Sequence, residues 1–205
     1  MADAVALVDY GAGNLHSVEN ALRAVGAQVH VTADAGEVAK AERIVLPGVG
    51  AFGFCAGGLR AVDGMVEALE ARVLGDGVPF LGICVGMQLL ATRGLEHGET
   101  PGLGWIAGDV VAIEPGREQV RVPHMGWNDV MLARHKPVVE AGEAYFLHSY
   151  HFVPEDENAV AARTDHGGKL VAAVAKDNIL GVQFHPEKSQ RYGLDLLARF
   201  LEWAP

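Results

Sequence analysis

The chain has 205 residues but only two cysteines, Cys55 and Cys84, and they form no C-x-x-C pair. So few cysteines argue against a disulfide scaffold and favour a reducing compartment, although one disulfide between the two stays possible. No apolar run approaches the roughly 20 residues that span a bilayer, and the N-terminus lacks a basic segment followed by an apolar stretch. We therefore expect a cytoplasmic protein.

Basic residues are also scarce, because 16 lysines and arginines face 26 acidic residues, for a formal net charge of −10. This balance argues against nucleic acid or an anionic membrane as the main partner. Half of the residues are apolar, and no repeat, linker or low-complexity tract interrupts the chain. The length suits one α/β domain with a substantial core, so we expect a single domain over residues 1–205.

Sequence features that would indicate a metal or a nucleotide cofactor are incomplete. His148 and His151 could form a metal pair, but no third ligand with suitable spacing accompanies them. The loop D-Y-G-A-G-N follows an apolar strand and invites a dinucleotide interpretation, yet His16 replaces the third glycine of that fingerprint. A tight turn between strand and helix explains the loop equally well, and we expect neither metal nor cofactor.

Apolar periodicity predicts alternating strands and helices, which is typical of an α/β fold. Helices are predicted over residues 15–25 and 59–74, and after Ser189, which can cap the last one. The predicted strands cover residues 4–8, 28–32, 43–46, 78–83, 103–106, 109–114, 145–150, 159–163, 170–174 and 179–184. The pair 159–163 and 170–174 flanks a glycine turn and is predicted to form a hairpin.

The stretch V-P-F-L-G-I-C-V-G-M-Q-L-L-A, residues 78–91, has the pattern of a nucleophile elbow. Its Cys84 lies between an apparent buried strand and a helix, with Gly82 and Gly86 two residues away on either side. Small neighbours are needed where the backbone turns tightly, and a helix N-terminus favours the reactive thiolate. A buried structural cysteine in a glycine-rich turn is the alternative.

A partner base follows the strand at residues 179–184, where His185, Pro186 and Glu187 stand in sequence. An imidazole can take a thiol proton, and a carboxylate can hold the other ring nitrogen. By itself this motif could be a turn with an incidental ion pair. Because chemistry in open α/β sheets gathers at the carboxyl ends of strands, Cys84, His185 and Glu187 are expected to act together.

A third strand ends in P-G-V-G, residues 47–50, and its glycines would let backbone N–H groups point into a cavity. Such a loop can form an oxyanion hole, or it can be a plain connection. The chain resembles the class I (triad) glutamine amidotransferases in this loop, in G-I-C-V-G-M-Q and in H-P-E.

That resemblance implies a three-layer α/β/α, flavodoxin-like fold with a mixed, mostly parallel central sheet. It also implies that glutamine is hydrolysed through a thioester on Cys84. By the same resemblance, the oxyanion is stabilised by the backbone at Gly48, Val49, Gly50 and Val85. Glutamine contacts are assigned to Gln88, Glu96, His148, Ser149 and Tyr150, although Gln88 and Glu96 could be surface polar residues.

One further stretch, P-H-M-G-W-N at residues 123–128, resembles the amidotransferases of histidine biosynthesis and not those of GMP, CTP, carbamoyl-phosphate or anthranilate synthesis. From composition alone it is a loop with a buried tryptophan. The resemblance implies a heterodimer with a (βα)₈-barrel cyclase subunit that receives ammonia. The interface residues would be Asn14, His124, Met125, Gly126, Trp127, Asn128 and Lys188. A glutaminase for another acceptor, such as pyridoxal phosphate synthesis, and a non-catalytic binding domain are the alternatives.

Overall fold

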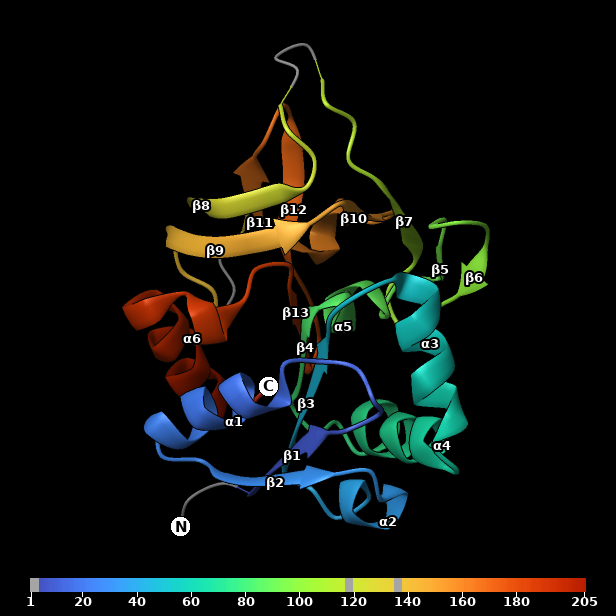
Figure 1. The fold of residues 1–205 in the computed structure, drawn as a ribbon. Helices are drawn as coiled ribbons and strands as arrows, with labels where there is room; N and C mark the ends of the chain where they lie inside the picture. The colour runs from blue at the N-terminus through green and yellow to red at the C-terminus, as the bar shows by residue number, and fades with distance from the viewer. Residues whose placement is uncertain (1–3, 117–119, 135–137) are drawn as a thin grey trace.

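The computed structural model describes residues 4–116, 120–134 and 138–205, and it has three layers (Figure 1). A nine-stranded sheet separates helices α1 and α6 on one face from α3 and α4 on the other (Figure 1). The first half contains β1 (Ala4–Val8), α1 (Leu15–Ala24), β2 (Gln28–Thr32), α2 (Ala35–Val38), β3 (Arg43–Gly48), α3 (Phe52–Ala61), α4 (Met65–Glu70), the π-helical η1 (Ala71–Gly75), β4 (Phe80–Cys84) and α5 (Val85–Gln88).

The second half begins with two short strands and ends in the long helix α6. Its elements are β5 (Arg93–Gly94), β6 (Thr100–Pro101), β7 (Gly108–Ala112), β8 (His124–Leu132), β9 (Gly142–His148), β10 (Tyr150–Pro154), η2 (Glu157–Ala159), β11 (Val160–Asp165), β12 (Lys169–Lys176), β13 (Ile179–Val182), η3 (Pro186–Lys188) and α6 (Gln190–Glu202).

The large sheet has the order β2-β1-β3-β4-β13-β12-β11-β8-β9 and is mixed. Its strands from β2 to β13 are parallel, and those from β13 to β9 pair antiparallel. Ile83 of β4 is level with Pro47 of β3 on one side and Val182 of β13 on the other. The carboxyl ends of three neighbouring strands therefore meet, which is where open α/β sheets bind ligands.

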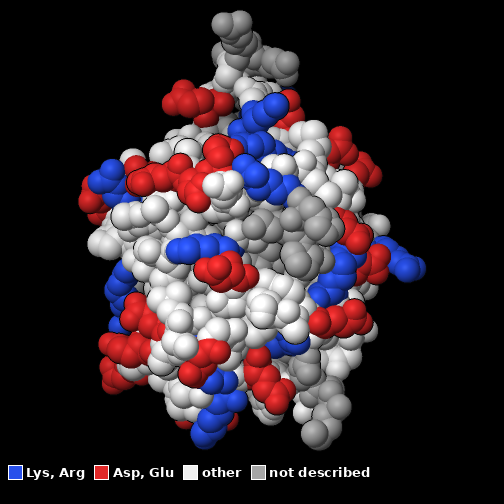
Figure 2. All heavy atoms as spheres, turned by 180° about the vertical axis from the view of Figure 1, so that it is seen from behind, with Lys and Arg blue, Asp and Glu red and all other residues white. Residues whose placement is uncertain are grey.

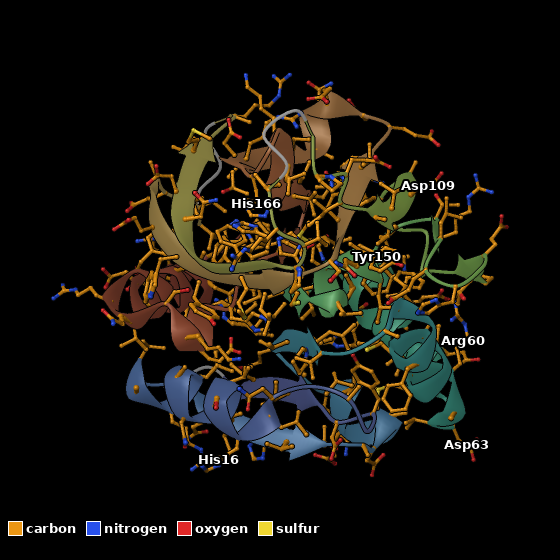
Figure 3. All side chains as sticks on the ribbon, turned by 45° about the horizontal axis from the view of Figure 1, so that its top comes forward. His16, Arg60, Asp63, Asp109, Tyr150 and His166 are labelled. Carbon is orange, nitrogen blue, oxygen red and sulfur yellow. The ribbon has the colours of Figure 1, made fainter. Side chains whose placement is uncertain are left out.

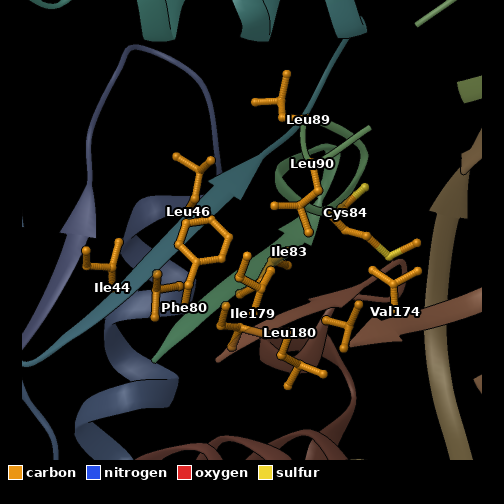
Figure 4. Close-up of a cluster of buried hydrophobic side chains, with 14 of the residues drawn as sticks. Ile44, Leu46, Phe80, Ile83, Cys84, Leu89, Leu90, Val174, Ile179 and Leu180 are labelled. Carbon is orange, nitrogen blue, oxygen red and sulfur yellow. The ribbon is translucent and has the colours of Figure 1, made fainter. Parts of the chain in front are cut away.

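The core is centred on β4, in which every residue is buried (Figure 4). Figure 4 shows Phe80 and Cys84 on this strand, with Ile44 of β3 and Ile179 of β13 on either side of it. A continuous apolar run is what a strand covered on both faces requires. The confirmed α/β fold thus holds Cys84 at the end of a fully buried strand of the parallel half.

Several predicted elements match the structure, including the strands at residues 4–8 and 28–32 and the hairpin of β11 and β12. The prediction of a single helix over residues 59–74 was wrong. Helix α3 begins at Phe52, and Gly64, with a φ of 70°, lies between it and α4. No strand forms at residues 103–106. The strand expected at 145–150 is interrupted at Ser149, since β9 joins the large sheet and β10 joins the small sheet β10-β7-β5-β6.

The P-H-M-G-W-N stretch was expected to be a loop, but it begins β8, a strand that pairs with β9 from His124 to Val130. Alternate residues of a strand face opposite sides, so His124 points inward and is 3% exposed, whereas Trp127 points outward and is 47% exposed. The prediction of a buried tryptophan was therefore wrong, because local composition does not fix which side of a strand faces solvent.

Acidic and basic side chains are interspersed over the face of the molecule that Figure 2 shows. On this face the net negative charge is not gathered into one large patch. Among the described residues, no helix is long and apolar enough to cross a membrane.

Candidate active site

Cys84 occupies a strained turn between β4 and α5, with a φ of 55° and a ψ of −111°. A positive φ is uncommon for a non-glycine residue, and such strain is concentrated at functional sites. Glycine is needed at both flanking positions because neighbouring atoms leave no room for a Cβ, and not because φ is positive there. A Cβ added to Gly82 would lie 2.6 Å from the Gly86 carbonyl oxygen, and one added to Gly86 would overlap the Leu46 carbonyl oxygen. The geometry is that of the elbow predicted from G-x-C-x-G.

The Cys84 side chain is buried at the bottom of a cavity of about 270 Å³. Its sulfur lies 3.9 Å from the Leu147 carbonyl oxygen and 3.7 Å from the amide nitrogen of Gln183. The other cysteine, Cys55, is also free, and its Sγ donates to the Val49 carbonyl oxygen at 3.4 Å. Burial raises the pKa of the Cys55 thiol to about 11, so it is protonated at neutral pH.

His185 follows β13 in an extended conformation, and its backbone N–H donates to the Tyr145 carbonyl oxygen at 2.9 Å. Its ring lines the same cavity as Cys84, and its Nδ1 lies 2.9 Å from the Glu187 Oε1. Burial disfavours the charged ring, but the hydrogen bonds and charges of Cys84 and Glu187 outweigh it and raise the pKa of His185 to about 10. The arrangement favours the imidazolium form of His185.

Ser189 supports this strand end in a way that the sequence did not indicate. It was expected to cap the last helix, but its hydroxyl makes no cap hydrogen bond to α6. The hydroxyl donates to the His185 carbonyl oxygen at 2.6 Å and accepts from the Tyr145 N–H at 2.9 Å. It thereby ties the segment that carries His185 to β9.

The P-G-V-G loop lies beside the cavity, with Gly50 at a φ of 100°. The Tyr10 hydroxyl donates to the Pro47 carbonyl oxygen at 2.6 Å and holds the start of the loop. Gly48 is packed behind the cavity, where an added Cβ would lie 2.7 Å from the Gly86 N and 2.8 Å from the Tyr10 hydroxyl. Val49, Gly50 and Val85 line the cavity itself.

The five residues that the resemblance assigned to glutamine binding all line the same cavity: Gln88, Glu96, His148, Ser149 and Tyr150. The Glu96 Oε2 accepts from the Phe52 N–H at the start of α3 at 2.7 Å. Figure 3 shows Tyr150 near the middle of the molecule, where β10 passes α5. The structure thus brings these residues together with Cys84 and His185.

Two buried histidines, His148 and His124, extend inward from the cavity wall. The half-buried His166, labelled in Figure 3, stacks on the ring of His124. His148 Nδ1 lies 2.9 Å from the Tyr150 carbonyl oxygen, and its Nε2 lies 3.0 Å from His124 Nδ1. Because a carbonyl only accepts, His148 carries its proton on Nδ1, so His124 donates to it and in turn accepts from Asn128. His124 and Asn128, expected at an interface, therefore belong to this inner network.

The outer face of β8 and β9 carries exposed apolar side chains next to the cavity. Met125 and Trp127 are opposite Leu147 and Tyr145, and Leu147 also lines the cavity. Met125 is 65% exposed, and the Lys188 Nζ lies 5.9 Å from the centre of the Tyr145 ring. Among the residues predicted for an interface, Met125, Trp127 and Lys188 are exposed, whereas Gly126 and Asn14 are half-buried.

Comparisons with known proteins agree on one family. The model of "Glutamine amidotransferase class-I" matches residues 6–203. The imidazole glycerol phosphate synthase subunit HisH of Zymomonas mobilis is 60% identical, with 98% of this chain and 96% of that protein covered. The same subunit of Caulobacter vibrioides is 54% identical, with 98% and 99% covered.

Solved structures with lower identity share the fold. A crystal structure of a glutamine amidotransferase is 21% identical with a TM-score of 0.72, and the match covers 94% of this chain and 98% of that one. The structure of PurLQS from Thermotoga maritima is 20% identical with a TM-score of 0.72, and 98% and 99% of the two chains are covered.

Proposed function

Because the chain belongs to the class-I glutamine amidotransferases and, within them, to the HisH subunits of imidazole glycerol phosphate synthase, we propose that Cys84, His185 and Glu187 form its glutaminase triad. The observation that carries this proposal is the position of His185, which lines one cavity with Cys84 and has its Nδ1 2.9 Å from the Glu187 Oε1. A buried thiol, a base and an orienting carboxylate are what covalent acyl transfer requires.

The reaction begins when the Cys84 thiolate attacks the carbon of the glutamine side-chain amide. His185 gives its proton to the departing nitrogen, so that ammonia leaves and a thioester remains on Cys84. Water then attacks the thioester, His185 takes a proton from it, and glutamate leaves as the thiolate returns. Glu187 holds Nδ1, so that Nε2 faces the reacting atoms in both steps.

Backbone N–H groups of the P-G-V-G loop, at Gly48, Val49 and Gly50, and of Val85 are proposed to stabilise the oxyanion of each tetrahedral intermediate. Donors that are fixed before the reaction stabilise such a charge without reorganising. Gln88, Glu96, His148, Ser149 and Tyr150 are proposed to hold the substrate glutamine, since all of them line the cavity with Cys84.

The ammonia product calls for a partner, because in bulk water it would be protonated and lose its nucleophilicity. We propose a heterodimer with a (βα)₈-barrel cyclase subunit, which uses the ammonia to make imidazole glycerol phosphate and an aminoimidazole carboxamide ribotide. The exposed Met125, Trp127 and Lys188 beside the cavity suit such an interface, and Asn14 and Gly126 are proposed at its edge. We further propose one domain over residues 1–205 and a place in the cytoplasm.

The test is glutamate release from glutamine by the purified chain, alone and then with the cyclase subunit and its ribotide ligand. Strong stimulation by the partner is expected. In the same complex, Cys84→Ala should abolish glutamine hydrolysis while leaving synthesis from added ammonia intact. Retained glutaminase activity in Cys84→Ala would refute the nucleophile assignment. A glutaminase rate that does not change when the cyclase subunit is added would refute the proposed partner.

A further inference from the structure

Gln183, two residues before His185, is fully buried and lies against the Cys84 sulfur. It follows Val182, which is level with Ile83 on β4, so the two strands place Gln183 and Cys84 side by side. A buried amide is costly unless each of its polar groups has a partner. The partners of this one are the Cys84 sulfur and the side chain of Gln88.

The orientation of the Gln183 amide follows from the hydrogen bonds of Gln88. The Gln88 Nε2 lies 2.9 Å from the Tyr150 carbonyl oxygen and 3.0 Å from the Gln183 Oε1. Since a backbone carbonyl only accepts, the nitrogen of Gln88 must be on this side, and its second hydrogen goes to an oxygen of Gln183. The nitrogen of Gln183 is then turned toward the Cys84 sulfur, 3.7 Å away.

We infer that Gln183 is a catalytic residue that donates an N–H to the Cys84 sulfur, and that Gln88 positions it. This inference rests on the proposed role of Cys84 as the nucleophile. A hydrogen bond to a charged acceptor is stronger than one to a neutral acceptor, so the donor favours the thiolate over the thiol. It does so again when the thioester breaks and the sulfur regains its charge.

The same bonds narrow the role of Gln88 in substrate binding. Both hydrogens of its amide are used, on Tyr150 and on Gln183, which leaves its oxygen as the group that faces a ligand. Gln88 is therefore expected to accept a hydrogen bond from an N–H group of glutamine and to donate none. Substrate contact and orientation of Gln183 are combined in one side chain.

The test is the pH dependence of Cys84 alkylation by iodoacetamide in the full chain, with each cysteine followed by mass spectrometry. Gln183→Met keeps the length of the side chain but removes the donor. It should move the pH midpoint of Cys84 alkylation upward by about one unit, which is about a tenfold smaller acid dissociation constant of the thiol. Gln88→Met should give a smaller upward shift, and the double variant no more than Gln183→Met alone.

Other titratable groups lie around Cys84, with Glu187 behind His185, and stay in place in every variant: His185, Glu187, Tyr10, Cys55, Glu96, His148, Tyr150 and Lys188. Gln28→Met, at an exposed position of β2, is the matched control and should leave the midpoint unchanged. Urea unfolding of each variant checks that it is folded. A midpoint in Gln183→Met equal to that of the unaltered chain would overturn the inference. Failure of the proposed function would show separately, as glutaminase activity in Cys84→Ala.

Discussion

The buried histidine pair should make folding stability fall in acid, and replacing His124 should remove about half of that fall. His124 and His148 are 3% and 6% exposed and are hydrogen-bonded to each other. Burial disfavours a charge on either ring and lowers the pKa of His124 to about 4 and that of His148 to about 3. In each case neighbouring histidines act in the same direction.

The size of the effect follows from linkage between protonation and folding. An unfolded histidine binds its proton below about pH 6.5, whereas these two stay neutral in the fold, so stability declines as the pH falls below that value. At about pH 5 the loss relative to about pH 7 is about 2 kcal/mol for each ring and about 4 kcal/mol for both. His185 acts in the opposite sense, because its raised pKa of about 10 keeps its contribution fully present below pH 6.5.

The measurement is equilibrium urea unfolding at about pH 7 and about pH 5, followed by tryptophan fluorescence in dilute protein, since the isoelectric point is about 5.3. His124→Asn should lower stability at both pH values but reduce the difference between them by about 2 kcal/mol. His30→Asn is the control, because His30 is exposed on β2. If His124→Asn keeps the pH difference of the unaltered chain, His124 is not held neutral and the reasoning fails.

Two further substitutions test the support of the elbow and of the base. Gly86→Ala should cost more than about 3 kcal/mol in urea unfolding, because its Cβ would overlap the Leu46 carbonyl oxygen, whereas Gly57→Ala in α3, where space is open, should be neutral or slightly stabilising. Ser189→Ala should cost about 1–3 kcal/mol and lower the rate of glutamate release, because the Tyr145 N–H and the His185 carbonyl lose a shared partner. A loss below about 0.5 kcal/mol in Ser189→Ala would contradict that account.

The strands of the parallel half of the sheet could be predicted because each of them is encoded locally. An apolar run with glycines around Cys84 specifies a buried strand and a tight turn, and His185 directly follows another apolar run. Once both are placed at carboxyl ends of strands in one sheet, their proximity follows from topology alone. The structure agrees, with β4 and β13 adjacent and in register.

The supporting contacts could not be predicted, because they depend on register between strands that lie far apart in the sequence. His124 was assigned to an interface and His148 to the substrate, yet the pairing of β8 with β9 places them directly opposite each other. Gly126 interrupts the alternating pattern that would have identified β8 as a strand. Ser189 has the sequence position of a helix cap, but a longer-range contact with β9 takes its hydroxyl.

The same distinction explains why the sequence pointed to Cys84, His185 and Glu187 but not to Gln183. Cys84 and His185 belong to types that carry chemistry, so their positions at strand ends were informative. Gln183 is an amide in an apolar strand, and only its burial beside a sulfur and a second amide gives it a direction. The proposed nucleophile is thus set by local sequence, whereas the N–H donor proposed for its sulfur is set by how β4, β13 and α5 pack together.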